Sequence, residues 1–276
     1  MNLQTTPTSL TLGFIGAGKL AGSVIRGLLL KDFCPPEQII ASQPIDDLRA
    51  ELQRETGIRV TAANTDVVEA ADIIFIGVKP TVVLPVIQET GAAIRHKLVI
   101  SLAAGIRLSR MEELADARFL RVMTNTPSAI GRGATAFAPG SRSTDADIAL
   151  VTQIFSAIGA VAPVTDDEID AVTALAGSGP AFVYTIIEAL AAGGAKTGLP
   201  HDVALTLATQ TVLGASQLAA ESRLSPEELR NMVITPGGTT AAGLAAMAKL
   251  GTSEGLIAAV EAAAARGREM AAEPGR

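Results

Sequence analysis

Residues 13–21 read GFIGAGKLA, and this stretch decides the fold. An apolar run precedes the glycines and a helical pattern follows them. The spacing G-x-G-x-x-A is that of a dinucleotide-binding turn, in which Gly16 permits the tight turn and Gly18 lets the backbone approach a pyrophosphate. Ala21 keeps the helix close to the sheet, and the helix N-terminus faces the anion. The glycine spacing alone is weak, and a strand–helix turn without a ligand is the alternative. As the first turn of an α/β chain it predicts dinucleotide binding.

The first half of the chain alternates short apolar runs with helical patterns. The runs are rich in Ile and Val and do not alternate with polar residues, as in strands buried on both faces of a parallel sheet. We expect strands at 11–16, 38–43, 72–78, 97–102, 119–123 and 161–165. We expect helices near 19–31, 45–56, 81–94 and 108–115, the last with Ser109 and Glu112 as a candidate capping box. This repetition predicts an α/β domain over 1–165 with a Rossmann-type, mostly parallel sheet.

From residue 166 the sequence becomes alanine-rich and helical in pattern. We expect helices at 180–197, 201–222, 225–233, 239–250 and 252–272. Ser225 and Glu228 form a capping box with Pro226 at the first helical position. The pattern predicts an all-helical domain over 166–276. Helices with many small residues pack closely and suit a dimer interface, with a monomeric helical cap as the alternative.

Composition excludes several classes of protein. Hydrophobic residues make up 48% of the chain and charged residues 18%, which argues against intrinsic disorder. The net charge of −6 disfavours a nucleic-acid binder. Cys34, His96 and His201 are too few for common metal sites, so we expect no metal. No run approaches the roughly 18 apolar residues of a membrane span, and the N-terminal MNLQTTPTSL lacks the pattern of a signal peptide. We therefore expect a cytoplasmic protein without membrane or nucleic-acid partners.

The end of the second expected strand bears on the choice of dinucleotide. NAD-type sites place an acidic residue there to hold the ribose, but this strand ends in Ala-Ser-Gln-Pro at 41–44. Without that carboxylate a 2′-phosphate meets no repulsion, and Ser42 and Gln43 could donate hydrogen bonds to it. The sequence therefore favours NADP(H). Because no arginine is decisive, use of NAD(H) stays open.

Further turns at strand ends face the same crevice. Lys79, in the stretch 77–80, reaches either a phosphate or the substrate, or is a solvated loop lysine. Asn64 serves the cofactor or caps the next helix through its side chain. Residues 103–105 close another strand, and the stretch TNTP at 124–127 ends the fifth expected strand at the same edge.

Two segments of the helical half are rich in Gly, Ser and Thr. They are 177–181 (GSGPA) and 235–240 (TPGGTT), and each precedes an apolar helix. Free backbone N–H groups and hydroxyls at a positive helix end make a ready site for a carboxylate. Ordinary helix capping is the alternative.

Taken together, these stretches resemble the pyrroline-5-carboxylate reductase family. The resemblance rests on GFIGAGKLA, IGVKP, RVMTNTP, DAVTALAGSGPAFVY and NMVITPGGTTAAGL, which follow the family's order from residue 13 to 244. It implies a Rossmann domain followed by a helical domain that forms interlocked dimers, often assembled further. It also implies reduction of 1-pyrroline-5-carboxylate to L-proline, with hydride transfer from NAD(P)H to the carbon of the cyclic imine.

Candidate site residues follow from these motifs and from the family that they resemble. The cofactor candidates are Ile15, Gly16, Ala17, Gly18, Lys19, Leu20, Ser42, Gln43, Asn64, Val78, Lys79, Pro80, Ala103, Ala104 and Gly105. The substrate candidates are Asp166, Ser178, Met232, Val233, Gly238, Thr239 and Thr240.

Thr240 is the catalytic candidate among them. An imine is basic enough to arrive protonated, so the Thr240 hydroxyl would bond the ring nitrogen or relay a proton from water. Asn231 stands where the family often has Asp, which argues against an acid–base role for that position.

Two other functions fit parts of the sequence. One is a Rossmann dehydrogenase of the β-hydroxyacid type, for which Lys196 or Lys249 would be the catalytic lysine. The other is a dinucleotide sensor without catalysis, which would keep GAGKLA and have no need of TPGGTT. The presence of both motifs favours the reductase.

Overall fold

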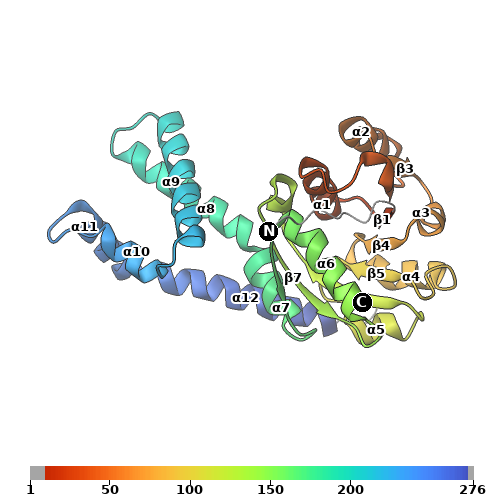
Figure 1. Ribbon diagram of the computed structural model, residues 1–276. Helices are drawn as coiled ribbons and strands as arrows, with labels where there is room; N and C mark the ends of the chain where they lie inside the picture. Colours follow the sequence, from red (N-terminus) through yellow and green to blue (C-terminus); the bar gives the residue numbers. More distant parts are fainter. Residues whose placement is uncertain (1–9, 273–276) are drawn as a thin grey trace. The chain divides into compact units, whose positions relative to one another are not determined.

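The computed structural model describes residues 10–272 (Figure 1). Residues 1–9, on which the expectation about a signal peptide rests, lie outside them. The described chain forms two compact units. The sheet unit runs through Ser178 and includes the residues from Ala262 onward, and the helical unit is Gly179–Glu261.

An eight-stranded sheet forms the centre of the sheet unit, in the order β3-β2-β1-β4-β5-β6-β7-β8. Neighbouring strands are parallel except for β6 and β7, which are antiparallel. The order of the first six strands is that of a doubly wound dinucleotide-binding fold, with the topological switch between β1 and β4. The strands are β1 (Leu12–Ile15), β2 (Ile39–Ser42), β3 (Arg59–Thr61), β4 (Ile73–Ile76), β5 (Leu98–Ser101), β6 (Arg118–Met123), β7 (Gly133–Pro139) and β8 (Gly159–Pro163).

Helices cover both faces of this sheet, which explains why its strands are apolar without alternation. On one face Phe14 and Phe75 stack with ring centroids 4.4 Å apart, beneath α1 (Lys19–Leu30), α2 (Asp46–Thr56) and α6 (Asp145–Ala157). On the other face Ile15 and Ile74 pack against α3 (Asn64–Ala70), α4 (Pro80–Thr90), α5 (Leu108–Glu112) and α7 (Ile169–Val172). Short segments are η1 (Pro36–Gln38), η2 (Thr126–Ile130) and the π-helical η3 (Thr173–Gly177).

The helical unit contains α8 (Gly179–Lys196), α9 (His201–Glu221), α10 (Pro226–Met232), α11 (Thr239–Lys249) and the first part of α12 (Thr252–Ala272). The expected capping box is confirmed: Ser225 Oγ accepts from the Glu228 N–H, and the Ser225 N–H donates to Glu228 Oε2 at 2.7 Å. The Ser225 N–H and hydroxyl both donate to the Glu228 carboxylate, and these two hydrogen bonds lower the pKa of Glu228. Among the described residues of this unit, only Ala191, Ala204 and Ala208 are buried. The helices therefore keep most of their apolar side chains exposed.

Two helical segments, Ile169–Lys196 and His201–Glu221, are long and apolar enough to cross a membrane by length and composition alone. The expectation that no segment is long and apolar enough to span a membrane considered only uninterrupted apolar runs. It therefore missed helices in which a few polar residues stand among many apolar residues, Ala and Gly. Helices that cover one another in an oligomer have the same composition.

Several expectations about elements need correction. The capping box at Ser109 is wrong, because α5 begins at Leu108 with Arg107 as its N-cap and no side-chain cap. The Leu108 N–H instead lies 3.3 Å from Oδ2 of Asp166. Four further elements were not predicted from the sequence: β3, β7, α3 and α6. Helix α6 begins with a capping box of Thr144 and Asp147.

The compact units do not divide at the expected boundary of 165 and 166. The sheet unit continues to Ser178 because α7 packs against β6 and β7. Ion pairs from Asp166 and Asp170 to Arg121, on β6, attach the same segment.

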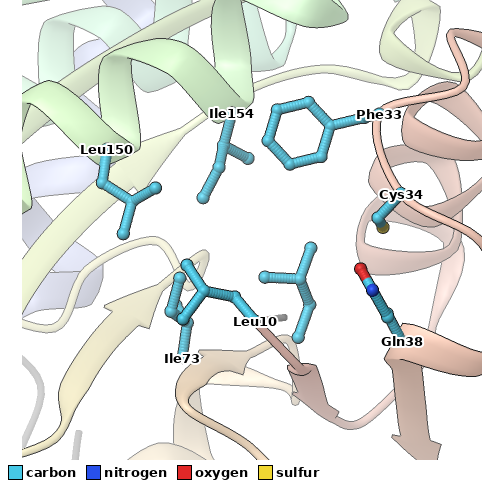
Figure 2. A pocket seen from close by; sticks show the side chains of 8 residues that line it. Leu10, Phe33, Cys34, Gln38, Ile73, Leu150 and Ile154 are labelled. Carbon is cyan, nitrogen blue, oxygen red and sulfur yellow. The ribbon is translucent and has the colours of Figure 1, made fainter. Parts of the chain in front are cut away.

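A small cavity lies between α6 and the turn after α1 (Figure 2). Its lining is apolar apart from Gln38 and the thiol of Cys34, and its volume is about 10 Å³. Burial raises the pKa of the Cys34 thiol to about 11. The cavity is far below the several hundred Å³ of ordinary ligand sites, so it is not a candidate active site.

Candidate active site

The turn after β1 has the geometry that an anion-binding turn requires. Gly16 has a φ of +82°, and a Cβ there would lie 2.6 Å from Cγ1 of Val78. A Cβ on Gly18 would meet only the Gly77 carbonyl, at 4.0 Å. Gly18 is the N-cap of α1 and offers no side-chain cap, so the first N–H groups of the helix have no side-chain acceptor at the cap. The open space beside Gly18 fits a pyrophosphate at the start of the helix.

The neighbouring turn after β4 packs tightly against this one. A Cβ on Gly77 would lie 2.6 Å both from the Cβ of Ala21 and from the carbonyl oxygen of Gly16. Ala21 is fully buried, so a larger residue at either position would force the two turns apart. This contact fixes the crevice at the topological switch between β1 and β4.

Ser42, at the end of β2, forms a hydrogen bond with the glycine turn after β1. Its hydroxyl donates to Oδ1 of Asn64 at 2.8 Å and accepts from the N–H of Gly16 at 3.1 Å. Ser42 is 1% exposed. A serine has a single O–H to donate, and here that proton goes to Asn64. The expected hydrogen bond from Ser42 to a 2′-phosphate stays a prediction. Asn64 does not cap α3, since the N-cap is Ala63 and no side chain caps that helix.

Gln43 is also hydrogen-bonded within the turn that follows β2. Its Oε1 accepts from the Ile45 N–H at 3.3 Å, and its main-chain carbonyl accepts from Nη1 of Arg49 at 2.7 Å. Arg49 also pairs with Asp46 at 2.6 Å. Arg49 was not predicted from the sequence. It comes six residues after Gln43, and the first turn of α2 brings it back beside the end of β2. An arginine one helical turn into the element after β2 was the available signal.

A cavity of about 430 Å³ opens at the carboxyl ends of β1, β4, β5 and β6. This volume is in the range of small-molecule sites. The lining side chains carry hydroxyl, amide and apolar groups, and the only charged one is Lys19. The lining residues are Lys19, Leu20, Gly77, Val78, Pro80, Leu102, Ala103, Ala104, Met123, Thr124, Asn125, Thr126, Thr173, Gly177 and Ser178.

The cavity therefore gathers the predicted residues Lys19, Leu20, Val78, Pro80, Ala103, Ala104 and Ser178. Ile15, Gly16, Ala17, Gly18, Ser42, Gln43, Asn64, Lys79 and Gly105 are not among its lining residues. Lys79 is the exposed N-cap of α4, and Gly105 has a φ of +73°. Since no carboxyl or imidazole lines the cavity, its described lining supplies no acid or base that titrates near neutral pH.

The segment 177–181 differs from the expected loop with a free helix start. Residues Ile169–Lys196 form a continuous helical run, and η3 is a π-helical turn within it. The Ser178 N–H is already bonded to the Thr173 carbonyl at 2.9 Å. Pro180 has no N–H for the carbonyl of Ala176, one helical turn earlier. Nδ2 of Asn125 donates to that carbonyl instead, at 3.1 Å.

Asn125 thus joins three elements around the cavity. It follows β6, its Oδ1 accepts from the Ala134 N–H of β7 at 3.0 Å, and its Nδ2 bonds η3. The side chain is 8% exposed. Since π-turns occur often at functional sites, this bridge makes η3 part of the site wall. The stretch TNTP lies at the edge of the sheet where it was expected, but no role was predicted for Asn125.

Asp166 lies outside the cavity lining and takes part in a buried charge network. Its Oδ1 accepts from Nη1 of Arg121 at 2.6 Å, and Nη1 of Arg107 donates to its carbonyl at 2.8 Å. Arg121 is 1% exposed and also pairs with the buried Asp170 at 3.5 Å. Nη2 of Arg107 lies 3.4 Å from Asp170 as well. Because its carboxylate is already paired, Asp166 is better suited to anchoring α7 than to binding substrate.

The other predicted substrate residues belong to the helical unit. Gly237 has a φ of +73°, and a Cβ on Gly238 would lie 2.2 Å from Oγ1 of Thr235. Gly238 is the N-cap of α11 without a side-chain cap, as expected, with Thr239 and Thr240 in the first turn. Thr240 is half-buried, while Met232, the last residue of α10, and Val233, the C-cap of that helix, are exposed.

A Rossmann sheet with an open phosphate turn, beside a cavity whose described lining holds no carboxyl or imidazole, defines an NAD(P)-dependent oxidoreductase. A pyrroline-5-carboxylate reductase from Pisum sativum is 43% identical over 264 residues, which cover 95% of this chain and 96% of the relative. The chain belongs to the pyrroline-5-carboxylate reductase family. Reduction of 1-pyrroline-5-carboxylate to proline is the reaction of that family.

Family models and solved structures agree with this membership. Residues 166–270 match the model described as pyrroline-5-carboxylate reductase dimerisation. Residues 11–105 match one described as NADP oxidoreductase, coenzyme F420-dependent. A reductase of this family from Coxiella burnetii is 32% identical with a TM-score of 0.87, over 96% of this chain and 99% of that one. The pyrroline carboxylate reductase of Plasmodium falciparum, solved with NADP bound, is 27% identical with a TM-score of 0.87 over the same shares.

Proposed function

We propose that this protein reduces 1-pyrroline-5-carboxylate to L-proline with NADPH as the preferred reductant and NADH as a second one. The observation that carries the proposal is the open space beside Gly18 at the start of α1, next to a cavity of small-molecule size. In the reaction one hydride adds to the imine carbon and one proton is held by the ring nitrogen. The dinucleotide leaves oxidised.

The cofactor is held by the sheet unit. The turn from Ile15 to Leu20 and the N-terminus of α1 bind the pyrophosphate, with the charge of Lys19 beside it. Ser42 and Asn64 keep that turn in shape, because they bond each other and the Gly16 N–H. The turns Val78–Pro80 and Ala103–Gly105, with Gln43, complete the cofactor set. The reduced nicotinamide, when bound, supplies the hydride.

The substrate carboxylate is held at the start of α11. Gly238, Thr239 and Thr240 begin a helix that lacks a side-chain cap, and such N–H groups bind anions. Met232 and Val233 supply apolar contacts to the ring, and Ser178 a hydroxyl. Asp166 contributes through its pairing with Arg121, without touching the substrate.

Proton supply follows from the chemistry of the cavity. An imine substrate is protonated near neutral pH, so the site needs a partner for the ring N–H rather than an acid. The hydroxyl of Thr240 is that partner, and in this sense Thr240 is the catalytic residue. Positioning of the two reactants then supplies most of the acceleration.

The helical unit forms a homodimer, and dimers assemble further. Exposed leucines on α8 and α9, among them Leu190, Leu207 and Leu213, support this proposal, as does the match to a dimerisation family. By function the chain divides into a dinucleotide domain, 1–165, and a substrate and dimerisation domain, 166–276. We propose a cytoplasmic protein that binds neither membrane nor nucleic acid.

An assay of the purified protein tests this function. With added 1-pyrroline-5-carboxylate, the absorbance of NADPH should fall and proline should form in equal amount. Absence of turnover with both NADPH and NADH would contradict the proposal. Assays with 3-hydroxy acids and NADP test the dehydrogenase alternative. Lys196 and Lys249, its candidate lysines, are exposed at the C-terminal ends of α8 and α11, where a cation fits the helix dipole.

A further inference from the structure

The turn between β2 and α2 holds an arginine that the proposed reaction does not use. Nη1 of Arg49 donates to the main-chain carbonyl of Gln43 at 2.7 Å, and Nη2 lies 2.6 Å from Oδ1 of Asp46. Gln43 directly follows the last residue of β2. In folds of this type the residue at that strand end meets the adenosine ribose. The guanidinium is therefore held at the ribose end of the crevice.

We propose that Arg49 binds the 2′-phosphate of NADP(H) and sets the preference of the enzyme for NADPH over NADH. This inference rests on the proposed function, because it names the group that selects between two forms of the same cofactor. A guanidinium presents N–H pairs that match two phosphate oxygens. The Arg49 side chain is 22% exposed, so it is oriented by Gln43 and Asp46 and still reachable by a ligand.

The side chains next to Arg49 already have hydrogen-bond partners within the protein, so Arg49 is the group that binds the 2′-phosphate. The proton of Ser42 is committed to Asn64, and the Gln43 side chain is largely buried and bonded to the Ile45 N–H. No carboxylate stands at the position of Gln43, where an NAD-type site has one. Arg49 is therefore the cation that this strand end offers to a phosphate.

Asp46 opposes Arg49. Its side chain is 87% exposed and shares the same guanidinium. A carboxylate repels the 2′-phosphate and competes for the N–H groups that would bind it. The balance between Arg49 and Asp46 therefore decides how strongly NADPH is preferred.

Binding of two nucleotide fragments to the full-length protein tests the inference. The fragments 2′,5′-ADP and 5′-AMP differ only in the 2′-phosphate, and titration calorimetry gives both Kd values without turnover. Arg49→Ala should raise the Kd of 2′,5′-ADP and NADPH by about ten- to a hundredfold, as for loss of a hydrogen bond to a charged group. The Kd of 5′-AMP and NADH should stay unchanged. Asp46→Asn should lower the Kd of NADPH by about two- to fivefold.

Arg54→Ala is the matched control, since Arg54 is an exposed arginine in the last turn of the same helix. It should leave all four Kd values unchanged. An equal loss in Arg54→Ala would reveal a general charge effect and overturn the inference. Equal loss of both fragments in Arg49→Ala, with a lower Tm, would show that Arg49 only supports the turn.

The failure of this inference is separable from that of the proposed function. If the folded wild-type protein bound neither fragment, the dinucleotide site itself would be wrong and both proposals would fall. If the wild type bound both and Arg49→Ala bound 2′,5′-ADP as tightly, only the role of Arg49 would be overturned. A selective loss in Arg49→Ala, together with the gain in Asp46→Asn, supports it.

Discussion

Gly16 and Gly18 lie in one turn and have opposite surroundings. A side chain on Gly16 would strike Val78 and strain a φ of +82°, whereas one on Gly18 would point into open space. The first glycine is required by the protein itself. The second is required only by a ligand. A substitution of Gly16 should therefore affect folding, whereas a substitution of Gly18 should affect ligand binding.

Gly18→Val should keep its fold and lose dinucleotide affinity. The branched side chain occupies the space that the pyrophosphate needs, and overpacking of this kind costs about 1–3 kcal/mol, or roughly ten- to a hundredfold in Kd. Titration of NADPH fluorescence measures the loss. Gly16→Val is the contrasting variant, with a clearly lower Tm. Unchanged affinity in Gly18→Val would make it an ordinary turn glycine.

Thr240→Val tests the proposed partner of the substrate nitrogen. The change keeps the β-branched shape and removes the hydroxyl, leaving a polar group of the substrate unpaired at a cost of about 1–3 kcal/mol. We expect kcat/KM to fall roughly ten- to a hundredfold, with unchanged NADPH affinity and Tm. Thr209→Val is the control, since the Thr209 hydroxyl bonds only its own helix, at the Leu205 carbonyl. Normal kcat/KM in a stable Thr240→Val would show that the hydroxyl is not used.

At the scale of elements, the sequence predicted the strands, turns and helix caps that depend on local patterns. The runs around Phe14 and Phe75 are apolar without alternation because helices cover both sheet faces, and periodicity detects that. The β1–α1 turn and the Ser225 cap have local signatures and were also predictable. The π-helical turn at 173–177 was not predicted, and its Ala176 carbonyl accepts a hydrogen bond from Asn125, a side chain distant in sequence. Arg49 was not predicted because it is several residues away from the end of β2 in the sequence, and only the first turn of α2 brings it back beside that strand end.

Asn125 and Pro180 should be energetically coupled. Asn125→Ala leaves the Ala176 carbonyl and the Ala134 N–H unpaired, so unfolding in urea at fixed protein concentration should show a loss of about 1–3 kcal/mol. Adding Pro180→Ala restores an N–H for the Ala176 carbonyl and should recover part of that loss. Strict additivity of the two substitutions would contradict the coupling.

The charge network at the start of α7 should be costly to break. Asp170 is buried between Arg107 and Arg121, and loss of one partner from a buried pair costs about 3–5 kcal/mol. Asp170→Asn should therefore lower the free energy of unfolding strongly. Asp167→Asn is the control, because the Asp167 side chain is 93% exposed and pairs with the same Arg107, so it should cost less than about 1 kcal/mol. Equal effects would mean that burial is not the cause.

At the scale of the whole molecule, apolar side chains are distributed unequally. The sheet unit buries most of its large apolar residues in two cores, while the helical unit leaves leucines along α8 and α9 exposed. Large exposed apolar faces mark association surfaces, and in this chain they coincide with the match to a dimerisation family.

Light scattering should give twice the mass of one chain, or a multiple of that dimer mass, at micromolar concentration and without detergent. Leu207→Asp, on α9 and 53% exposed, should shift the protein toward monomer by placing a charge in the dimer interface. Leu30→Asp is the matched control, since Leu30 is 58% exposed at the end of α1 in the sheet unit. A monomeric wild type, or equal dissociation by both variants, would contradict the proposed dimer surface.

The last helix, α12, ends in a different compact unit from the one in which it begins. Its residues from Ala262 onward belong to the sheet unit, where Gly267 approaches Asp170 of α7. During synthesis the sheet unit therefore lacks a segment until nearly the whole chain has left the ribosome. Domains generally fold as units, N-terminal ones first. Here the sheet unit is the first to be synthesised, but it is complete only after the segment that begins at Ala262 has been made. Nascent chains stalled before residue 262 should consequently carry a sheet unit that is more readily cleaved by protease than the same unit in the released protein.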